Sequence, residues 1–258
     1  MTQPLLELRG VNKSFGVVHV LHDVDFKVYP GQVTALVGDN GAGKSTLVKI
    51  IAGIYGRDSG DYFFEERLVD VHGPRDVAAL GVEVVYQDLA LCDNLDIVQN
   101  MFLGREETKG INLDEVTMES RARETLASLS VRTVKSVRQS VSSLSGGQRQ
   151  TVAIAKAVLW NSKVVLLDEP TAALGVAQTR QVLDLVRRLA DRGLGVVLIS
   201  HNMNEVLEVA DRITALYLGR VAADVPAKKV NHSQIVELIT AGRSGDLGIA
   251  ENPLDATV

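Results

Sequence analysis

The residues best suited to chemistry form one glycine-rich stretch, Gly38-Asp39-Asn40-Gly41-Ala42-Gly43-Lys44-Ser45, with Thr46 directly after it. The stretch matches the pattern G-x-x-x-x-G-K-[ST], which about one random chain in a hundred of this length would contain. Its glycines let the backbone curl so that successive N–H groups point at phosphate oxygens, and a helix that starts there adds its positive end. We expect Lys44 to bridge the β- and γ-phosphates of a nucleotide and the Ser45 hydroxyl to bind Mg²⁺.

A second candidate is the pair of adjacent carboxylates Asp168 and Glu169, which follows the apolar run 164–167. If this run is a buried parallel strand, its carboxyl end lies where α/β sheets bind ligands. Asp168 could then hold Mg²⁺, and Glu169 could orient and deprotonate an attacking water. A strand that simply ends in solvated acids is a common alternative, and the phosphate-binding motif is the reason to prefer the catalytic interpretation.

Short apolar runs rich in β-branched residues are the strands expected to carry these groups. They are bounded by turn signals and cover 33–37, 82–85, 164–167 and 196–199. Continuous apolar strands suit a parallel sheet that is covered on both faces. Two stripes at helical spacing lie between or after them, a clear one (Val182, Leu185, Val186, Leu189, with Gly193 as the stop) and a weaker one (Ala122, Thr125, Leu126, Leu129). Strands that alternate with helices predict an α/β fold.

Two regions depart from this alternation. Residues 88–160 have mostly helical patterns and no clear strand, which predicts a helical insertion or subdomain. Residues 241–258 contain three glycines, one proline and little periodicity, which predicts a loosely ordered tail.

Composition narrows the class of protein. The 258 residues carry 27 Lys+Arg against 32 Asp+Glu, a net charge of −5, without the clustered basic excess typical of nucleic-acid binders. The single cysteine, Cys92, excludes an internal disulfide. No run approaches the roughly 20 apolar residues of a spanning helix, and Glu7 and Arg9 stand where a signal peptide would be apolar. A reduced, cytosolic chain is the simplest interpretation.

The pentapeptide Leu144-Ser145-Gly146-Gly147-Gln148 lies between the phosphate-binding motif and the two carboxylates. Fewer than about one such chain in a thousand would contain it by chance. This order and spacing resemble the ATP-binding cassette (ABC) ATPases, the motor subunits of ABC transporters, over about residues 5–238. The resemblance implies an ABC ATPase fold in one domain, 5–240: a P-loop NTPase core, a helical subdomain at about 88–160 and an N-terminal antiparallel β region.

The resemblance also assigns roles to single residues. Ser145, Gly146, Gly147 and Gln148 would bind the γ-phosphate of ATP held at Lys44 of a second copy of the chain, so that ATP joins two subunits. Gln87 would reach Mg²⁺ and the attacking water, although a lone glutamine after a strand is usually a surface amide. His201 would contact the γ-phosphate and position Glu169, and Phe15 would stack on adenine, although an aromatic side chain there could equally belong to the core.

One position departs from the family pattern. Many members have Asp six residues after the catalytic glutamate, where it helps to couple the two ATP sites across the dimer, and this chain has Gly175. The departure leaves carboxylate-mediated coupling in doubt, while each site keeps its own hydrolytic residues.

The stretches 85–93 and 169–176 are similar to those of ATPases that serve importers of monosaccharides such as ribose, xylose and fructose. In the family the first of these stretches faces the membrane subunit. The resemblance therefore implies a Mg²⁺-dependent ATPase at the inner face of the cell membrane, with an integral membrane permease and, indirectly, an extracytoplasmic sugar-binding protein as partners. No nucleic-acid partner is expected.

Two other functions are open. A soluble ABC ATPase of a ribosome or nucleic-acid machine would usually have paired cassettes, long coiled coils or a basic surface, and none of these is seen in the sequence. A nucleotide-sensing regulator without turnover would be expected to have lost Glu169 or His201, and both are present.

Overall fold

The computed structural model describes residues 3–129, 131 and 134–249, and within these ranges the strands form two main sheets. The antiparallel sheet has the order β2-β1-β4-β5 and comprises β1 (Leu6–Phe15), β2 (Val18–Val28), β4 (Ser59–Phe64) and β5 (Arg67–Leu68). The larger sheet has the order β12-β11-β3-β10-β9-β6 and comprises β3 (Val33–Gly38), β6 (Val82–Val85), β9 (Val164–Asp168), β10 (Gly195–Ile199), β11 (Arg212–Tyr217) and β12 (Arg220–Pro226).

Helices follow most strands of the larger sheet. They are α1 (Lys44–Ile51), α2 (Pro74–Ala79), α3 (Ile97–Phe102), α4 (Glu115–Ser128), α5 (Gly146–Val158), α6 (Val176–Asp191), α7 (Met203–Val209) and α8 (His232–Ala241), with the short 3₁₀ helices η1 (Val141–Ser143) and η2 (Ala227–Lys229). None of the described helices is long and apolar enough to cross a bilayer.

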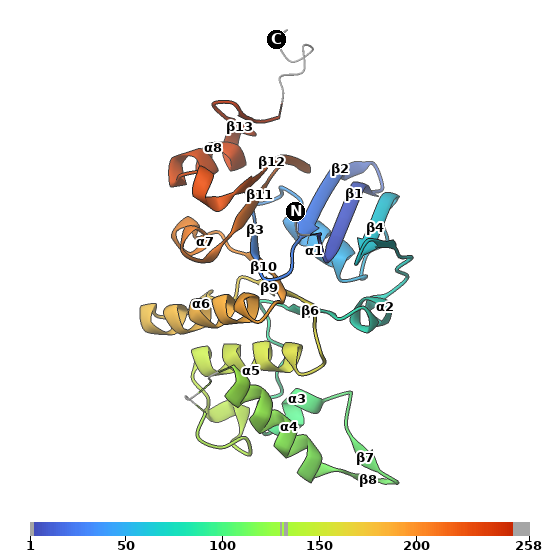
Figure 1. Cartoon of the computed structure of the whole chain (residues 1–258), viewed down its shortest axis with the longest axis vertical. Helices are drawn as coiled ribbons and strands as arrows, with labels where there is room; N and C mark the ends of the chain where they lie inside the picture. The colour runs from blue at the N-terminus through green and yellow to red at the C-terminus, as the bar shows by residue number, and fades with distance from the viewer. Residues whose placement is uncertain (1–2, 130, 132–133, 250–258) are drawn as a thin grey trace.

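The larger sheet is covered on both faces, as its continuous apolar strands predict. In β9, Val165 and Leu167 pack with α5 and α6, whereas Val164 and Leu166 pack with α1 and the antiparallel sheet. Figure 1 shows α6 on one side of β3, β10 and β9, and α1, β1 and β2 on the other.

The predicted elements agree with the structure to within a residue or two. The run 82–85 is β6, and the other predicted strands gain one residue at one end. The stripe from Val182 to Leu189 is the buried face of α6, and Gly193, at φ 93°, follows its end in the left-handed region.

The stretch between β6 and β9 contains α3, α4 and α5, which Figure 1 shows as a group of helices beside the two sheets. It also contains a small hairpin that the sequence did not predict, β7 (Thr108–Lys109) with β8 (Asn112–Leu113). The prediction of a loosely ordered tail, 241–258, is wrong for its first part, because β13 (Arg243–Ser244) pairs with β14 (Leu247–Gly248). The rest of the predicted tail, 250–258, lies outside the described residues.

The buried side-chain amide of Asn100 holds the segment between β6 and α3 in place through hydrogen bonds. Asn100 is fully buried; its Nδ2 donates to the carbonyl oxygens of Cys92 (3.0 Å) and Asp96 (3.0 Å), and its Oδ1 accepts from the Cys92 N–H (2.7 Å). One side chain on α3 therefore satisfies backbone groups of the loop that precedes this helix.

Asn100→Ala should lower the free energy of unfolding by about 1–3 kcal/mol, because it leaves these backbone groups unpaired. Guanidinium unfolding followed by circular dichroism measures the change. The control is Asn204→Ala, which alters an exposed side chain on α7 and should change the value by less than about 0.5 kcal/mol. Equal stabilities of the two variants would contradict this prediction.

Candidate active site

The glycine-rich stretch, the predicted phosphate-binding loop, connects β3 to α1. Gly43 is the N-cap of α1 at φ 101°, and Gly41 has φ 82°, a conformation that glycine adopts with little cost. Lys44 Nζ donates to the carbonyl oxygens of Gly38 (2.8 Å) and Asp39 (2.9 Å), so the ammonium lies across the loop. A cavity of about 220 Å³ opens here, lined by Val20, Asn40, Gly41, Gly43, Lys44, Ser45 and Thr46.

Gly38 is required by packing against backbone, and Gly43 by its left-handed φ of 101°. A Cβ atom on Gly38 would lie 2.6 Å from the carbonyl oxygen of Leu216, and one on Gly43 would lie 2.7 Å from Leu21 Cδ2. The loop can therefore keep its path only without side chains at these positions.

The parallel sheet brings the predicted carboxylates and the histidine to one edge. Ile199 pairs with Leu36 of β3 on one side and with Asp168 of β9 on the other. His201 and Glu169 therefore leave neighbouring strands together, and His201 Nδ1 lies 3.2 Å from Glu169 Oε1. The family resemblance implies that His201 positions Glu169, and the structure brings these two side chains together.

Groups of both charges lie at this edge of the sheet, and each affects the pKa of the others. Burial raises the pKa of Asp168, and the neighbouring Glu169 adds to the rise, while Lys44 and Lys49 act against it. Burial likewise lowers the pKa of Lys44, and the nearby carboxylates of Glu169, Asp39 and Asp168 act against that shift. Lys44 is therefore close enough to the carboxylates to interact with them electrostatically.

The oxygen donors at this edge are of the type that Mg²⁺ prefers, namely the Ser45 hydroxyl, the Asp168 carboxylate and the Gln87 amide. Asp168 fits such a role because its half-buried carboxylate is disfavoured by desolvation and by Glu169. Gln87 follows β6, which pairs with β9 in parallel. Its side chain is exposed and, among the described residues, makes no hydrogen bond.

Phe15 ends β1, in the antiparallel sheet, with 43% of the residue exposed. Its ring meets that of Tyr55 edge to face at 5.2 Å, and Lys13 Nζ lies 5.3 Å from the ring centroid. The exposed part of the ring could stack on a base, so Phe15 is not simply a core residue.

Ser145 caps the start of α5. Its hydroxyl accepts from the Gln148 N–H at 3.4 Å, and the Gln148 side chain accepts from the Ser145 N–H at 2.9 Å. Residues 145–148 do not line the cavity at the phosphate-binding loop. Figure 1 places α5 with α3 and α4, away from α1. This chain therefore does not bring the two motifs together within one copy.

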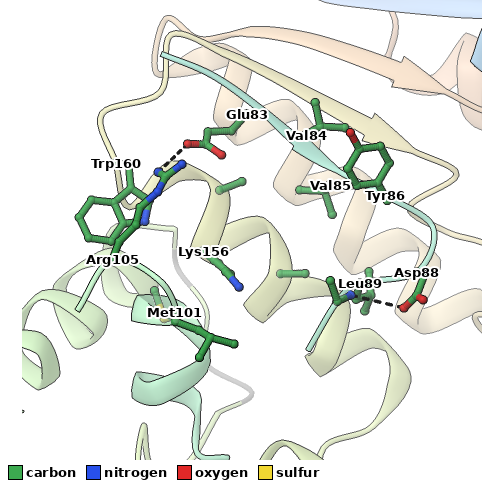
Figure 2. A pocket seen from close by; sticks show the side chains of 14 residues that line it. Glu83, Val84, Val85, Tyr86, Asp88, Leu89, Met101, Arg105, Lys156 and Trp160 are labelled. Atoms are coloured by element: carbon green, nitrogen blue, oxygen red, sulfur yellow. Dashed lines mark hydrogen bonds and ion pairs between the residues drawn. The ribbon is translucent and has the colours of Figure 1, made fainter. Parts of the chain in front are cut away.

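A second cavity, of about 290 Å³, lies beside β6 and the residues after it. Figure 2 shows Lys156 of α5 pointing into it, between the Glu83–Arg105 pair and Leu89. Arg105 Nη1 donates to Glu83 Oε1 at 2.7 Å, and its guanidinium carbon lies 5.4 Å from the Trp160 ring centroid. Burial lowers the pKa of Lys156, and within the described part of the chain no carboxylate pairs with it. Part of its lining comes from the stretch 85–93, which the sequence singles out, whereas Met101, Arg105, Lys156 and Trp160 join it only through the fold.

Comparisons with known proteins identify the family. Residues 21–172 match the family model described as "ABC transporter". The chain belongs to the ABC transporter family. It is an ATP hydrolase of this family, and its fold is the ABC ATPase fold that the resemblance implied.

Two relatives match over almost their whole length. The xylose/arabinose import ATP-binding protein of Sulfolobus acidocaldarius is 45% identical, over 96% of this chain and 98% of the relative. The fructose import ATP-binding protein of Rhizobium meliloti is also 45% identical, over 93% and 95%. A ribose import ATP-binding protein of Clostridium tetani is 35% identical over 92% of this chain, which spans 47% of that protein.

Solved structures agree with the fold. A nucleotide-free ATP-binding cassette from an ABC transporter superposes with a TM-score of 0.80 at 24% identity, covering 93% of this chain and 96% of the other. An ATP-binding cassette of an ABC transporter in its ADP conformation gives 0.79 at 25% identity, with the same coverage.

Gly43→Ala should weaken nucleotide binding at least about tenfold, because φ at this position is 101° and the new Cβ atom would also lie 2.7 Å from Leu21 Cδ2, at the end of the loop where α1 begins. Titration with a fluorescent ATP analogue measures the affinity. Gly56→Ala is the control, since a Cβ atom there has nothing within 4 Å. Wild-type affinity in the Gly43 variant would show that this loop does not hold the phosphates.

Proposed function

We propose that this chain is the ATP-hydrolysing subunit of a monosaccharide importer. The main support is the match over almost the whole chain, at 45% identity, to two relatives that are named for import of xylose/arabinose and of fructose. The chain works at the inner face of the membrane as one ATP-binding domain, 5–240, with residues 88–160 as its helical subdomain. A separate extracytoplasmic protein delivers the sugar to the permease.

The experiment is uptake by vesicles that contain a monosaccharide permease with which this chain co-purifies, with that transporter's sugar-binding protein outside and the purified chain and ATP inside. Uptake of labelled xylose, arabinose, fructose or ribose with ATP, and not with ADP, supports the proposal. If none of these sugars enters while the chain hydrolyses ATP normally in the same vesicles, the sugar assignment is wrong.

The site residues then divide the work of phosphoryl transfer, which is mostly positioning and electrostatics. Lys44 and the backbone N–H groups of the loop hold the phosphates, and Ser45, Asp168 and Gln87 would hold Mg²⁺. When bound, Mg²⁺ neutralises phosphate charge. Glu169 takes the proton of the attacking water, and His201, 3.2 Å from it, holds its carboxylate toward the γ-phosphate.

The start of α5 completes the site from a second copy of the chain. Its N–H groups and the Ser145 hydroxyl form an anion-binding helix end, and they face no phosphate of their own chain. Gly146 and Gly147 keep the end open, while Gln148 supports it through the capping bonds with Ser145. Adenine stacks on the exposed part of Phe15.

Glu169→Gln should keep ATP binding and lower the hydrolysis rate by roughly 10² to 10⁴, the usual contribution of a general base. Steady-state phosphate release measures the rate, and light scattering with MgATP should detect a trapped dimer. A wild-type rate contradicts the role of Glu169. A strictly monomeric variant saturated with MgATP contradicts the shared site.

The cavity around Lys156 is our proposed contact for the permease. It borders the stretch after β6 that contains Gln87, so a segment seated there lies next to the catalytic edge. Its apolar walls and an ammonium without a carboxylate partner suit a permease segment that carries an acidic side chain.

Lys156→Glu should reduce co-sedimentation of the chain with permease-containing membranes by about tenfold, since an acidic segment would meet a carboxylate instead of an ammonium. The control is Lys228→Glu on η2, an exposed lysine that does not line this cavity. Equal co-sedimentation of the two variants would exclude this cavity as the contact.

A further inference from the structure

Glu205, on α7, connects the two loops that carry Glu169 and His201. Its Oε2 accepts from Thr171 Oγ1 at 2.5 Å and, more weakly, from Ser200 Oγ at 3.4 Å. Its Oε1 accepts from Asn202 Nδ2 at 3.0 Å. One carboxylate therefore bonds to the loop after β9 and to both neighbours of His201 after β10.

The loop after β9 has a backbone conformation that needs support. Glu169 has φ 46° and Ala173 has φ 59°, and such left-handed conformations cost free energy in residues other than glycine. The Glu169 N–H donates to the Ile199 carbonyl at 2.9 Å, which fixes the start of the loop. Thr171, two residues on, is fixed by its bond to Glu205.

The loop after β10 is equally dependent on side-chain bonds. His201 is 73% exposed at its side chain, so packing does not hold the imidazole. Ser200, in contrast, is buried, and its Oγ accepts from the Asn202 N–H at 3.0 Å. Contacts of Ser200 and Asn202, on either side of His201, therefore hold the backbone from which the imidazole reaches Glu169.

Glu205 is itself held in place by its helix. Asn202 caps α7 by accepting from the Asn204 N–H at 3.1 Å. Val206 and Val209 of α7 are buried against core clusters of the larger sheet. The backbone at Glu205 is therefore fixed relative to β10, and this places the Glu205 carboxylate where it can bond to both loops.

We propose that Glu205 is a positioning residue for ATP hydrolysis, which holds the two loops together so that His201 and Glu169 stay within hydrogen-bond distance. The inference rests on the proposed roles of His201 and Glu169. The three donors to its carboxylate are the side chains of Thr171, Ser200 and Asn202, all of them in the two loops. Glu205 acts through the geometry of His201 and Glu169.

The test is the steady-state ATPase activity of the full chain with Glu205→Ala, Glu205→Gln, Thr171→Ala and Thr171→Ser. Glu205→Ala should lower kcat about 10- to 100-fold, the loss typical when an outer hydrogen-bond partner is removed at metal sites. The affinity for ATP should change less than about twofold, because the phosphate-binding loop is untouched. Thr171→Ala should lower kcat in the same direction, and Thr171→Ser, which keeps the hydroxyl, should restore it.

A double variant separates positioning from general destabilisation. In the His201→Ala background, adding Glu205→Ala should lower kcat by less than about threefold, because residues that act as one unit are not additive. A full 10- to 100-fold loss in that background would overturn the proposal. So would a wild-type kcat in Glu205→Ala when His201→Ala and Glu169→Gln are both slow.

Glu208→Ala is the matched control on the same helix, since Glu208 is exposed and, in the described structure, makes no hydrogen bond. It should leave kcat unchanged. If His201→Ala and Glu169→Gln themselves keep wild-type rates, the proposed roles of those two residues fail, which is a different result from failure of the Glu205 proposal alone.

Discussion

The register of four parallel strands is the constraint on which the site depends. Ile199 of β10 pairs with both Leu36 and Asp168, and Leu167 pairs with Val85 of β6. The loops that follow these strands therefore begin in one row. Because both faces of the sheet are buried, a slip by one residue would exchange the side chains of the two cores, so the same packing that stabilises the sheet aligns the catalytic groups.

These loops also bring charged side chains close together. Lys44 lies among carboxylates that act against the effect of burial on its pKa, and it acts in turn against the rise at Asp168. In the proposed function, a triphosphate would bring anionic groups to Lys44, and its Mg²⁺ would bring a cation to Asp168. Each of these half-buried groups would then gain a partner of opposite charge.

Gly175, where many ABC ATPases have Asp, begins α6 as its N-cap. A Cβ atom there would meet nothing within 4 Å, so the missing carboxylate is not explained by lack of space. The adjoining residues still contact the start of α5: Cβ atoms on Gly146 and Gly147 would lie 3.2 Å and 3.1 Å from Leu174 and Gln178. The segment after Glu169 is therefore packed against the Ser145 helix end without that carboxylate.

Local patterns in the sequence determined the phosphate-binding loop, the strands that carry the site, the buried stripe of α6 and the helix start at Ser145, because each depends on neighbours within a few residues. Only the tertiary structure decided which distant groups meet. Glu205 bonds to Thr171 across 34 residues of chain, and Lys156 comes to lie in a cavity with Glu83 and Arg105. These contacts depend on the spatial strand order β3-β10-β9-β6 and on the packing of the helices beside this sheet. Because the strands have a different order along the chain, the sequence around Glu205 or Lys156 does not show which distant residues these side chains contact.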